Sequence, residues 1–156
     1  MNAGARAAWL SALGSDLEGA RVLDLFAGSG ALGLEALSRG AASVDFVESG
    51  AAALHALRAN VARFRARNVT RVFVKDAMAF LDRLTEGSYD IAFADPPYTS
   101  TLGGRVVERW RATPFARILG IEHPADVRLP GGASGARFGE GAFTIFRMPK
   151  DVRTNS

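Results

Sequence analysis

One stretch near the start of the chain, residues 22–33 with the sequence VLDLFAGSGALG, constrains the fold more than any other part. It begins with a short apolar run, residues 22–26, and continues through a glycine turn into residues 31–39, whose composition is typical of a helix. Gly28 and Gly30 have no Cβ, so the backbone can turn tightly there and approach a ligand closely. The first N–H groups of the following helix favour a negatively charged ligand group. Strand, turn and helix in this order therefore predict a nucleotide-type cradle.

An acidic residue downstream supports the same interpretation. Gly28, Gly30 and Gly33 fit the dinucleotide-binding fingerprint, in which the third glycine lets the helix pack close to the strand. Glu48 follows about 20 residues after the first glycine, at the end of the apolar run of residues 44–47. A carboxylate there can accept hydrogen bonds from both ribose hydroxyls. Two ligand classes fit this pattern, a nicotinamide or flavin dinucleotide and S-adenosylmethionine; alternatively, the glycine turn only connects a strand to a helix.

The rest of the chain continues the alternation of strand and helix. We expect strands at residues 22–26, 43–48, 71–75, 89–94, 118–121 and 143–146, and helices at residues 5–13, 31–39, 51–67, 77–84 and from 105 onward. This pattern predicts an α/β fold, a single doubly wound, mostly parallel sheet with helices on both faces. The glycine-rich residues 131–141 predict a C-terminal antiparallel hairpin. The length of 156 residues favours one domain, residues 1–150, with residues 151–156 as a disordered tail.

The second long helix has a clear apolar stripe. Within residues 51–67, large apolar side chains recur at spacings of three and four and predict one buried face: Leu54, Leu57, Val61 and Phe64. Asn68 fits a left-handed cap at the end of this helix. Asp76 can cap the start of the next one.

The ends of successive expected strands carry the residues that can bind a ligand. These positions are Gly28, Glu48, Asp76 and Asp95. In an open parallel sheet, ligands collect at the C-terminal ends of the strands, near the point where the strand order reverses. We therefore expect four separated stretches of the chain to meet at one edge of the sheet.

The tetrapeptide Asp95-Pro96-Pro97-Tyr98 follows a buried strand and favours one of the two ligand classes. Proline has no N–H and holds the preceding residue extended, so the segment presents acceptors, the Asp95 carboxylate and the Pro96 carbonyl. Two acceptors can hold an exocyclic amino group of a base and aim its lone pair at the methyl group of a sulfonium cofactor. Tyr98 can stack on the base. A dinucleotide oxidoreductase has no need of this edge; the alternative is a proline-rich turn with a chance tyrosine.

Composition excludes several classes of site. The chain has no cysteine, and therefore neither a disulfide nor a thiolate metal site, and its two histidines are too far apart to indicate a zinc site. No apolar run approaches the ~20 residues that cross a bilayer, and the first residues show no secretory signal. We expect no metal, no membrane association and a cytoplasmic location.

Basic residues are unevenly distributed in this chain of net charge +3. They form two groups, Arg58, Arg63, Arg65, Arg67, Arg71 and Lys75, and then Arg105, Arg109, Arg111 and Arg117. Such groups can follow the phosphates of a nucleic acid. They are equally compatible with a solvated helix face.

Together these motifs resemble the amino-group methyltransferases that bind S-adenosylmethionine on a Rossmann-type fold. The closer resemblance is to the RsmD-type family of bacterial 16S ribosomal RNA guanine-N2 methyltransferases. It covers most of residues 5–147 and rests on residues 24–41 and on shorter motifs: Val47-Glu48, Asp76-Ala77, Asp95-Pro96-Pro97-Tyr98, Glu122-His123 and Arg137-Phe138-Gly139.

The resemblance implies a role for each motif. The cofactor S-adenosylmethionine is expected to contact Asp24, Phe26, Ala27, Gly28, Ser29, Gly30, Glu48, Asp76, Ala77 and Asp95. Among these, the glycine turn faces the methionine part, Glu48 the ribose, and Asp76 with the Ala77 N–H the adenine. The catalytic residues are expected to be Asp95, Pro96, Pro97 and Tyr98.

The implied substrate is ribosomal RNA within an assembled small ribosomal subunit, because the chain has no room for a separate sequence-reading domain. We expect a monomer. Residues 5–13 resemble only the helix that follows the family's basic N-terminal segment, so we expect that extension to be absent. Two alternatives stay open, a catalytically weak nucleic-acid-binding homologue without that segment and a dinucleotide-dependent oxidoreductase.

Overall fold

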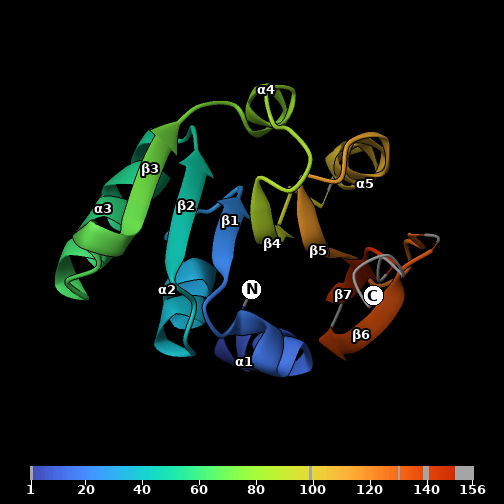
Figure 1. Cartoon of the computed structure of the whole chain (residues 1–156), viewed down its shortest axis with the longest axis horizontal. Coiled ribbons are helices and arrows are strands. Elements are labelled where there is room, and N and C mark those ends of the chain that lie inside the picture. Colours follow the sequence, from blue (N-terminus) through green and yellow to red (C-terminus); the bar gives the residue numbers. More distant parts are fainter. Residues whose placement is uncertain (1, 99, 130, 139–140, 150–156) are drawn as a thin grey trace, which may run out of the picture.

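A seven-stranded sheet forms the centre of the part of the chain that the computed structural model describes, residues 2–98, 100–129, 131–138 and 141–149 (Figure 1). Its strands are β1 (Arg21–Leu25), β2 (Ser43–Glu48), β3 (Thr70–Val74), β4 (Tyr89–Ala94), β5 (Ala116–Pro124), β6 (Ala133–Phe138) and β7 (Gly141–Arg147). They lie in the order β3-β2-β1-β4-β5-β7-β6. Strands β1 to β5 are parallel, and β7 runs antiparallel to both β5 and β6. This confirms the predicted mostly parallel sheet with a C-terminal hairpin.

Helices cover both faces of the sheet, as predicted. They are α1 (Ala3–Leu13), α2 (Ala31–Ser38), α3 (Ala51–Arg63), α4 (Ala77–Leu81) and α5 (Leu102–Ala112). Side chains on successive strand residues point to opposite faces. Val22 accordingly packs in a cluster with α1, α2 and α3, whereas Leu23 packs in another with α4 and α5 (Figure 1).

The strand order reverses between β1 and β4. The chain moves outward from β1 through β2 to β3 and then returns to place β4 on the other side of β1. The glycine turn follows β1, and Asp95 follows β4. These two segments therefore flank the switch point where ligands bind in doubly wound folds.

Helix α1 is attached to the sheet through Trp9. The fully buried indole stacks on Phe143, with ring centroids 5.4 Å apart, and meets Phe93 edge-on at the same centroid distance. Gly120 of β5 leaves room for the ring, because a Cβ there would lie 2.5 Å from Trp9 Nε1. The N-terminal helix is thus packed against the same sheet that carries the glycine turn.

The prediction for the end of α3 was wrong in three respects. The helix ends at Arg63 instead of residue 67, and Phe64 is 63% exposed instead of completing the buried stripe. Arg65, with φ 52°, takes the left-handed position expected for Asn68, which lies in the short 3-10 turn Arg67–Val69. The helix stops early because the chain must turn back within a few residues to begin β3.

Other element boundaries also differ from the sequence-based expectation. Helix α4 ends at Leu81, α5 already starts at Leu102, and β5 extends over Ala116–Pro124 because it pairs with β4 and with β7. The expected tail, residues 151–156, and Gly139 of the last motif lie outside the described residues. Within those residues, none of the helices is both long and apolar enough to cross a membrane.

Candidate active site

The turn after β1 depends on unusual backbone conformations. Phe26, Gly28 and Gly30 have positive φ angles of 55°, 57° and 80°. Gly30 precedes the first residue of α2, and a Cβ there would collide with the Leu57 side chain. A Cβ on Gly33 would lie 2.6 Å from the Phe46 ring, so α2 can approach the sheet only with glycine at this position. The predicted close packing of helix and strand is confirmed.

Asp24 is a buried carboxyl beneath the turn. Its Oδ2 accepts a hydrogen bond of 3.1 Å from the Gly33 N–H, which ties the strand to the first turn of α2. Burial raises the pKa of Asp24 well above its usual value, and the Gly33 N–H opposes this effect. The nearby carboxyls of Asp95 and Glu48 raise the pKa of Asp24 further. Three acidic groups therefore converge where β1, β2 and β4 end.

Glu48 is held in place by backbone donors. Its Oε1 accepts a 2.8 Å hydrogen bond from the Gly28 N–H, and its Oε2 accepts two of the same length from the N–H groups of Ser49 and Gly50. The carboxylate thus connects the end of β2 to the glycine turn. An ionised carboxylate has about four acceptor positions. Glu48 can therefore still receive a hydroxyl of a ligand.

Asp76 serves as the helix cap that the sequence predicted. Its Oδ2 accepts a 3.0 Å hydrogen bond from the Ala79 N–H at the start of α4, and the neighbouring Ala77 is buried. Because Glu48 pairs with Val74 across β2 and β3, Asp76 follows the same sheet edge. Its contact with an adenine stays a prediction.

Two hollows meet at the segment after β4. The first, of about 200 Å³, is lined by Arg6, Asp24, Phe26, Ala27, Gly28, Ser29, Ala31, Leu32 and Asp95. We call it the glycine-turn hollow. Six of the ten predicted cofactor residues line it. The structure does not bring Gly30, Glu48, Asp76 and Ala77 into its lining, although Glu48 binds Gly28 directly.

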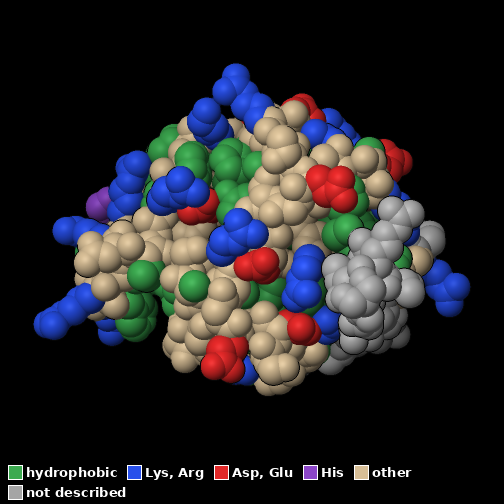
Figure 2. Space-filling view, viewed as in Figure 1, with side chains coloured by type: hydrophobic (Ala, Val, Ile, Leu, Met, Phe, Trp, Pro, Cys, Tyr) green, Lys and Arg blue, Asp and Glu red, His purple; other side chains and the backbone are tan. Residues whose placement is uncertain are grey.

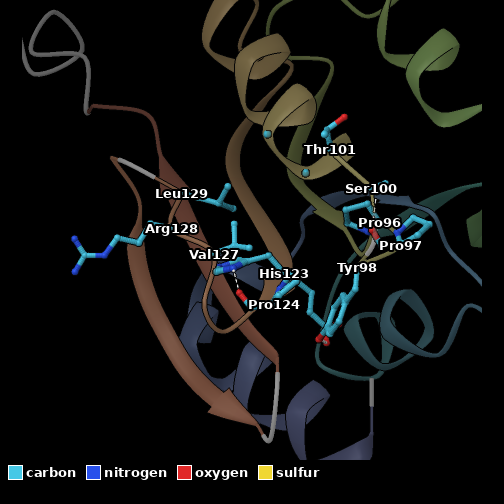
Figure 3. Close-up of a pocket in the computed structure, with 13 residues that line it drawn as sticks. Pro96, Pro97, Tyr98, Ser100, Thr101, His123, Pro124, Val127, Arg128 and Leu129 are labelled. Carbon is cyan, nitrogen blue, oxygen red and sulfur yellow. Dashed lines mark hydrogen bonds between the residues drawn. The ribbon is translucent and has the colours of Figure 1, made fainter.

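The second hollow, which we call the DPPY pocket, has a volume of about 360 Å³. Pro96, Pro97 and Tyr98 form one side of it, and its other side comes from the end of β5 and the segment that follows, with Glu122, Val127 and Leu129 (Figure 3). Its lining is largely apolar, apart from a few polar groups. Asp95 lines the glycine-turn hollow, and the next three residues line the DPPY pocket. The tetrapeptide is thus the boundary between the two.

Glu122 is a site residue for which the sequence suggested no role, although it stands in the Glu122-His123 motif of the resemblance. The Tyr98 hydroxyl donates a 2.9 Å hydrogen bond to Glu122 Oε1, and the other carboxyl oxygen is buried. Burial, followed by the hydrogen bond and negative charge of Glu122, raises the pKa of Asp95 to about 7. The available signal was the position of Glu122 at the end of the fifth strand, beside the end of the fourth.

His123, by contrast, supports the wall of the DPPY pocket. Its Nδ1 lies 2.9 Å from the Pro124 carbonyl and its Nε2 2.7 Å from Thr144 Oγ1. A carbonyl only accepts, so Nδ1 donates. This buried ring therefore joins β5 to β7. Within the described residues, no group of three or more acidic or histidine side chains could hold a metal ion.

The comparisons with known proteins agree on one family. Residues 1–114 match the family model described as conserved hypothetical protein 95. Over 80 residues, the chain is 48% identical to ribosomal RNA small subunit methyltransferase D of Escherichia coli, covering 51% of this chain and 39% of that protein. It is 38% identical over 123 residues to YlbH of Bacillus subtilis, named as a candidate rRNA methyltransferase, covering 76% of this chain and 67% of YlbH.

A solved structure has the same fold. The candidate methyltransferase yhhF of Escherichia coli is 29% identical and superimposes with a TM-score of 0.78, covering 91% of this chain and 82% of that one. The sequence match to methyltransferase D spans about two fifths of that protein's length, 39%. Because the family model matches most of the chain and the fold agrees, this chain belongs to the conserved hypothetical protein 95 family, the RsmD-type methyltransferases.

Proposed function

We propose that this protein transfers a methyl group from S-adenosylmethionine to the N2 amino group of a guanine in small-subunit ribosomal RNA. One observation carries the proposal. The tetrapeptide after β4 separates the glycine-turn hollow, suited to the cofactor, from the DPPY pocket, suited to a base. A group held at Asp95 and Pro96 would lie between cofactor and base. The names of the relatives refer to ribosomal RNA methylation and support the coarser part of the proposal, methyl transfer to ribosomal RNA.

The charge of the glycine-turn hollow favours S-adenosylmethionine over a dinucleotide. Asp95 and Glu48 are close enough to Asp24 to raise its pKa through charge repulsion. A ligand with a sulfonium and an ammonium group would relieve this repulsion, whereas a pyrophosphate would add to it. At Gly28, which lines the hollow, a Cβ would meet nothing within 4 Å, so the turn is open to a ligand there. The residues present therefore fit S-adenosylmethionine, which supplies an electrophilic methyl group when bound.

The chain's own residues act mainly by positioning. The Asp95 carboxylate and the Pro96 carbonyl accept hydrogen bonds from the two N–H bonds of the amino group, which leaves its lone pair directed at the methyl carbon. Holding the reacting atoms about 3–3.5 Å apart supplies much of the rate. In the transfer, the amino nitrogen would gain the N–C bond as the S–CH3 bond of the sulfonium breaks and leaves a neutral thioether, and the nitrogen would lose one proton. The Asp95–Glu122 carboxyl pair, whose Asp95 pKa is about 7, can receive it.

Cofactor binding gives the first test. Replacing Glu48 with alanine should weaken S-adenosylmethionine binding by about 1.5–3 kcal/mol, the range for hydrogen bonds to a charged group. Isothermal titration calorimetry measures this directly, with NAD as the competing ligand. Unchanged affinity would remove Glu48 from the cofactor site. Binding of NAD in place of S-adenosylmethionine would favour the oxidoreductase alternative and overturn the proposal.

The pH dependence of the rate gives a second test. Because a protonated Asp95 is a poorer acceptor, kcat/KM for methyl transfer should fall as the pH drops through about 7 and rise above it. Glu122→Gln removes the negative charge that disfavours ionised Asp95, so the midpoint should move to lower pH. Initial rates at low RNA concentration across this range measure both profiles. Identical midpoints for wild type and variant would contradict the proposed coupling of the two carboxyls.

A further inference from the structure

A third hollow, larger than the other two, adjoins the glycine-turn hollow on the α1–α2–α3 side of the sheet. We call it the Phe64 groove; it has a volume of about 630 Å³ and its lining includes Arg6, Ala31, Arg63, Phe64, Arg65 and Val69. We propose that it binds a single-stranded segment of the substrate RNA, with an unpaired base on the Phe64 ring and the phosphates at the arginines. This inference rests on the proposed function, because it assumes that the substrate is RNA.

The first argument is that the groove contains a solvent-exposed aromatic side chain. Phe64 is 63% exposed and Val69 is 41% exposed, although Leu57 and Val61 on the same side of α3 are buried. The Arg63 guanidinium lies 5.8 Å from the centre of the Phe64 ring. An exposed ring beside a guanidinium is the arrangement on which unpaired bases stack, and such stacking tolerates any base.

The second argument is charge. No acidic residue occurs between Glu48 and Asp76, while Arg63, Arg65 and Arg67 are all exposed. Figure 2 shows lysine and arginine side chains projecting along the edge of the molecule formed by α3 and β3. Glu35 also lines the groove, but Arg6 and Arg39 lie 3.9 and 3.4 Å from its carboxylate and offset its charge. The groove therefore suits a polyanion.

Other basic residues are already engaged in the fold. Arg71 donates two hydrogen bonds, of 2.9 and 2.7 Å, to the buried Asp45 carboxylate. In the second basic group, Arg109 binds Thr113 and the Asp82 carboxylate, and Arg111 lies over the Phe146 ring. Arg58 and Lys75 are exposed as well, but Arg63 and Arg65 stand on either side of the exposed Phe64 in the chain.

The third argument is the backbone at Arg65. Its φ of 52° places it in the left-handed region just past Phe64, the C-cap of α3, and the Ala66 N–H donates a 2.9 Å hydrogen bond to the Val61 carbonyl. Glycine is the residue that this helix-ending position favours, because a Cβ is unfavourable there. Arginine gives a less stable turn than glycine but adds a positive charge at the rim of the groove.

The fourth argument is continuity with the active site. Arg6 and Ala31 line both the Phe64 groove and the glycine-turn hollow that contains Asp95. An RNA strand bound in the groove therefore lies beside the hollow that contains Asp95, the first residue of the tetrapeptide that borders the DPPY pocket.

The test uses full-length protein and a short, fluorescently labelled single-stranded RNA, with binding measured by anisotropy at several salt concentrations. Phe64→Ala should weaken binding roughly 5- to 150-fold, the effect of losing one base stack. Phe64→Tyr should bind like wild type, and Phe64→Leu should lose affinity although it stays apolar. Arg65→Gly should lower the affinity and reduce the salt slope by about one, yet raise the melting temperature.

Arg83→Gln, which removes an exposed charge from the end of α4, serves as the control and should leave the affinity nearly unchanged. S-adenosylmethionine binding should stay at the wild-type value in every variant.

Wild-type RNA affinity in both Phe64→Ala and Arg65→Gly would overturn the inference while leaving the methyl-transfer proposal intact. A wild-type dimer in sedimentation that Phe64→Ala dissociates and Phe64→Leu retains would assign the groove to a second copy of the chain instead. Failure of the wild type to bind S-adenosylmethionine would instead count against the proposed function.

Discussion

Replacing Asp95 with alanine should lower the single-turnover rate of methyl transfer about a hundredfold to a thousandfold, the usual effect of removing one preorganised polar contact to a reacting centre. The variant loses one of the two acceptors that hold the amino group but keeps the glycine turn, Asp24 and Glu48, so S-adenosylmethionine should still bind. The measurement combines single-turnover transfer to small ribosomal subunits at saturating cofactor with calorimetry of cofactor binding.

Asp95→Asn is the matched control for this prediction. It keeps the shape of the side chain and one acceptor oxygen, so it should retain more activity than the alanine variant. It also removes the titration at pH about 7, so its rate should depend less on pH than that of the wild type. A wild-type rate in Asp95→Ala would show that the tetrapeptide does not act on the amino group.

The largest expected effect on stability is at Trp9. Trp9→Ala should lower the free energy of unfolding by about 3–5 kcal/mol, because it opens a cavity between α1 and the sheet and removes contacts with two aromatic rings. Denaturant unfolding monitored by far-UV circular dichroism measures the change. Trp9→Phe, which keeps a ring at this place, should cost less.

This prediction also concerns the site, because α1 carries Arg6, which lines both the glycine-turn hollow and the Phe64 groove. A partly detached α1 would therefore weaken cofactor binding as well as stability. An unfolding midpoint for Trp9→Ala equal to that of the wild type would mean that α1 contributes little to the fold.

Much of the fold could be predicted because its information is local. The bounds of β2 and β4 matched the expected ranges, since apolar runs bounded by turn residues fix a buried strand. The turn after β1 could also be predicted, because its glycines lie close together in the sequence. The end of α3 could not be predicted locally. Arg65 occupies a left-handed position at which glycine or asparagine is the usual residue. The sequence therefore predicted Asn68 as the cap.

In the site, too, residues of contiguous motifs could be predicted, and a contact between separate strands could not. Residues of the glycine turn and the tetrapeptide were identifiable because each motif is contiguous in sequence. The Glu122-His123 motif was noted, but the role of Glu122 was missed. Its contact with Tyr98 and its effect on Asp95 exist only through the pairing of β4 with β5, in which Ala94 lies opposite Ile121. Such a contact between separate strand ends leaves no periodic or spacing signal in the sequence.

The most direct test of the account is the identity of the methylated atom. The protein is incubated with isotopically labelled S-adenosylmethionine and small ribosomal subunits from cells that lack the corresponding methylation, and the ribosomal RNA is digested to nucleosides for mass spectrometry. The account predicts label in N2-methylguanosine and its near absence with Asp95→Ala. Label on a ring nitrogen or a ribose oxygen, or no label with protein that binds the cofactor, would contradict it.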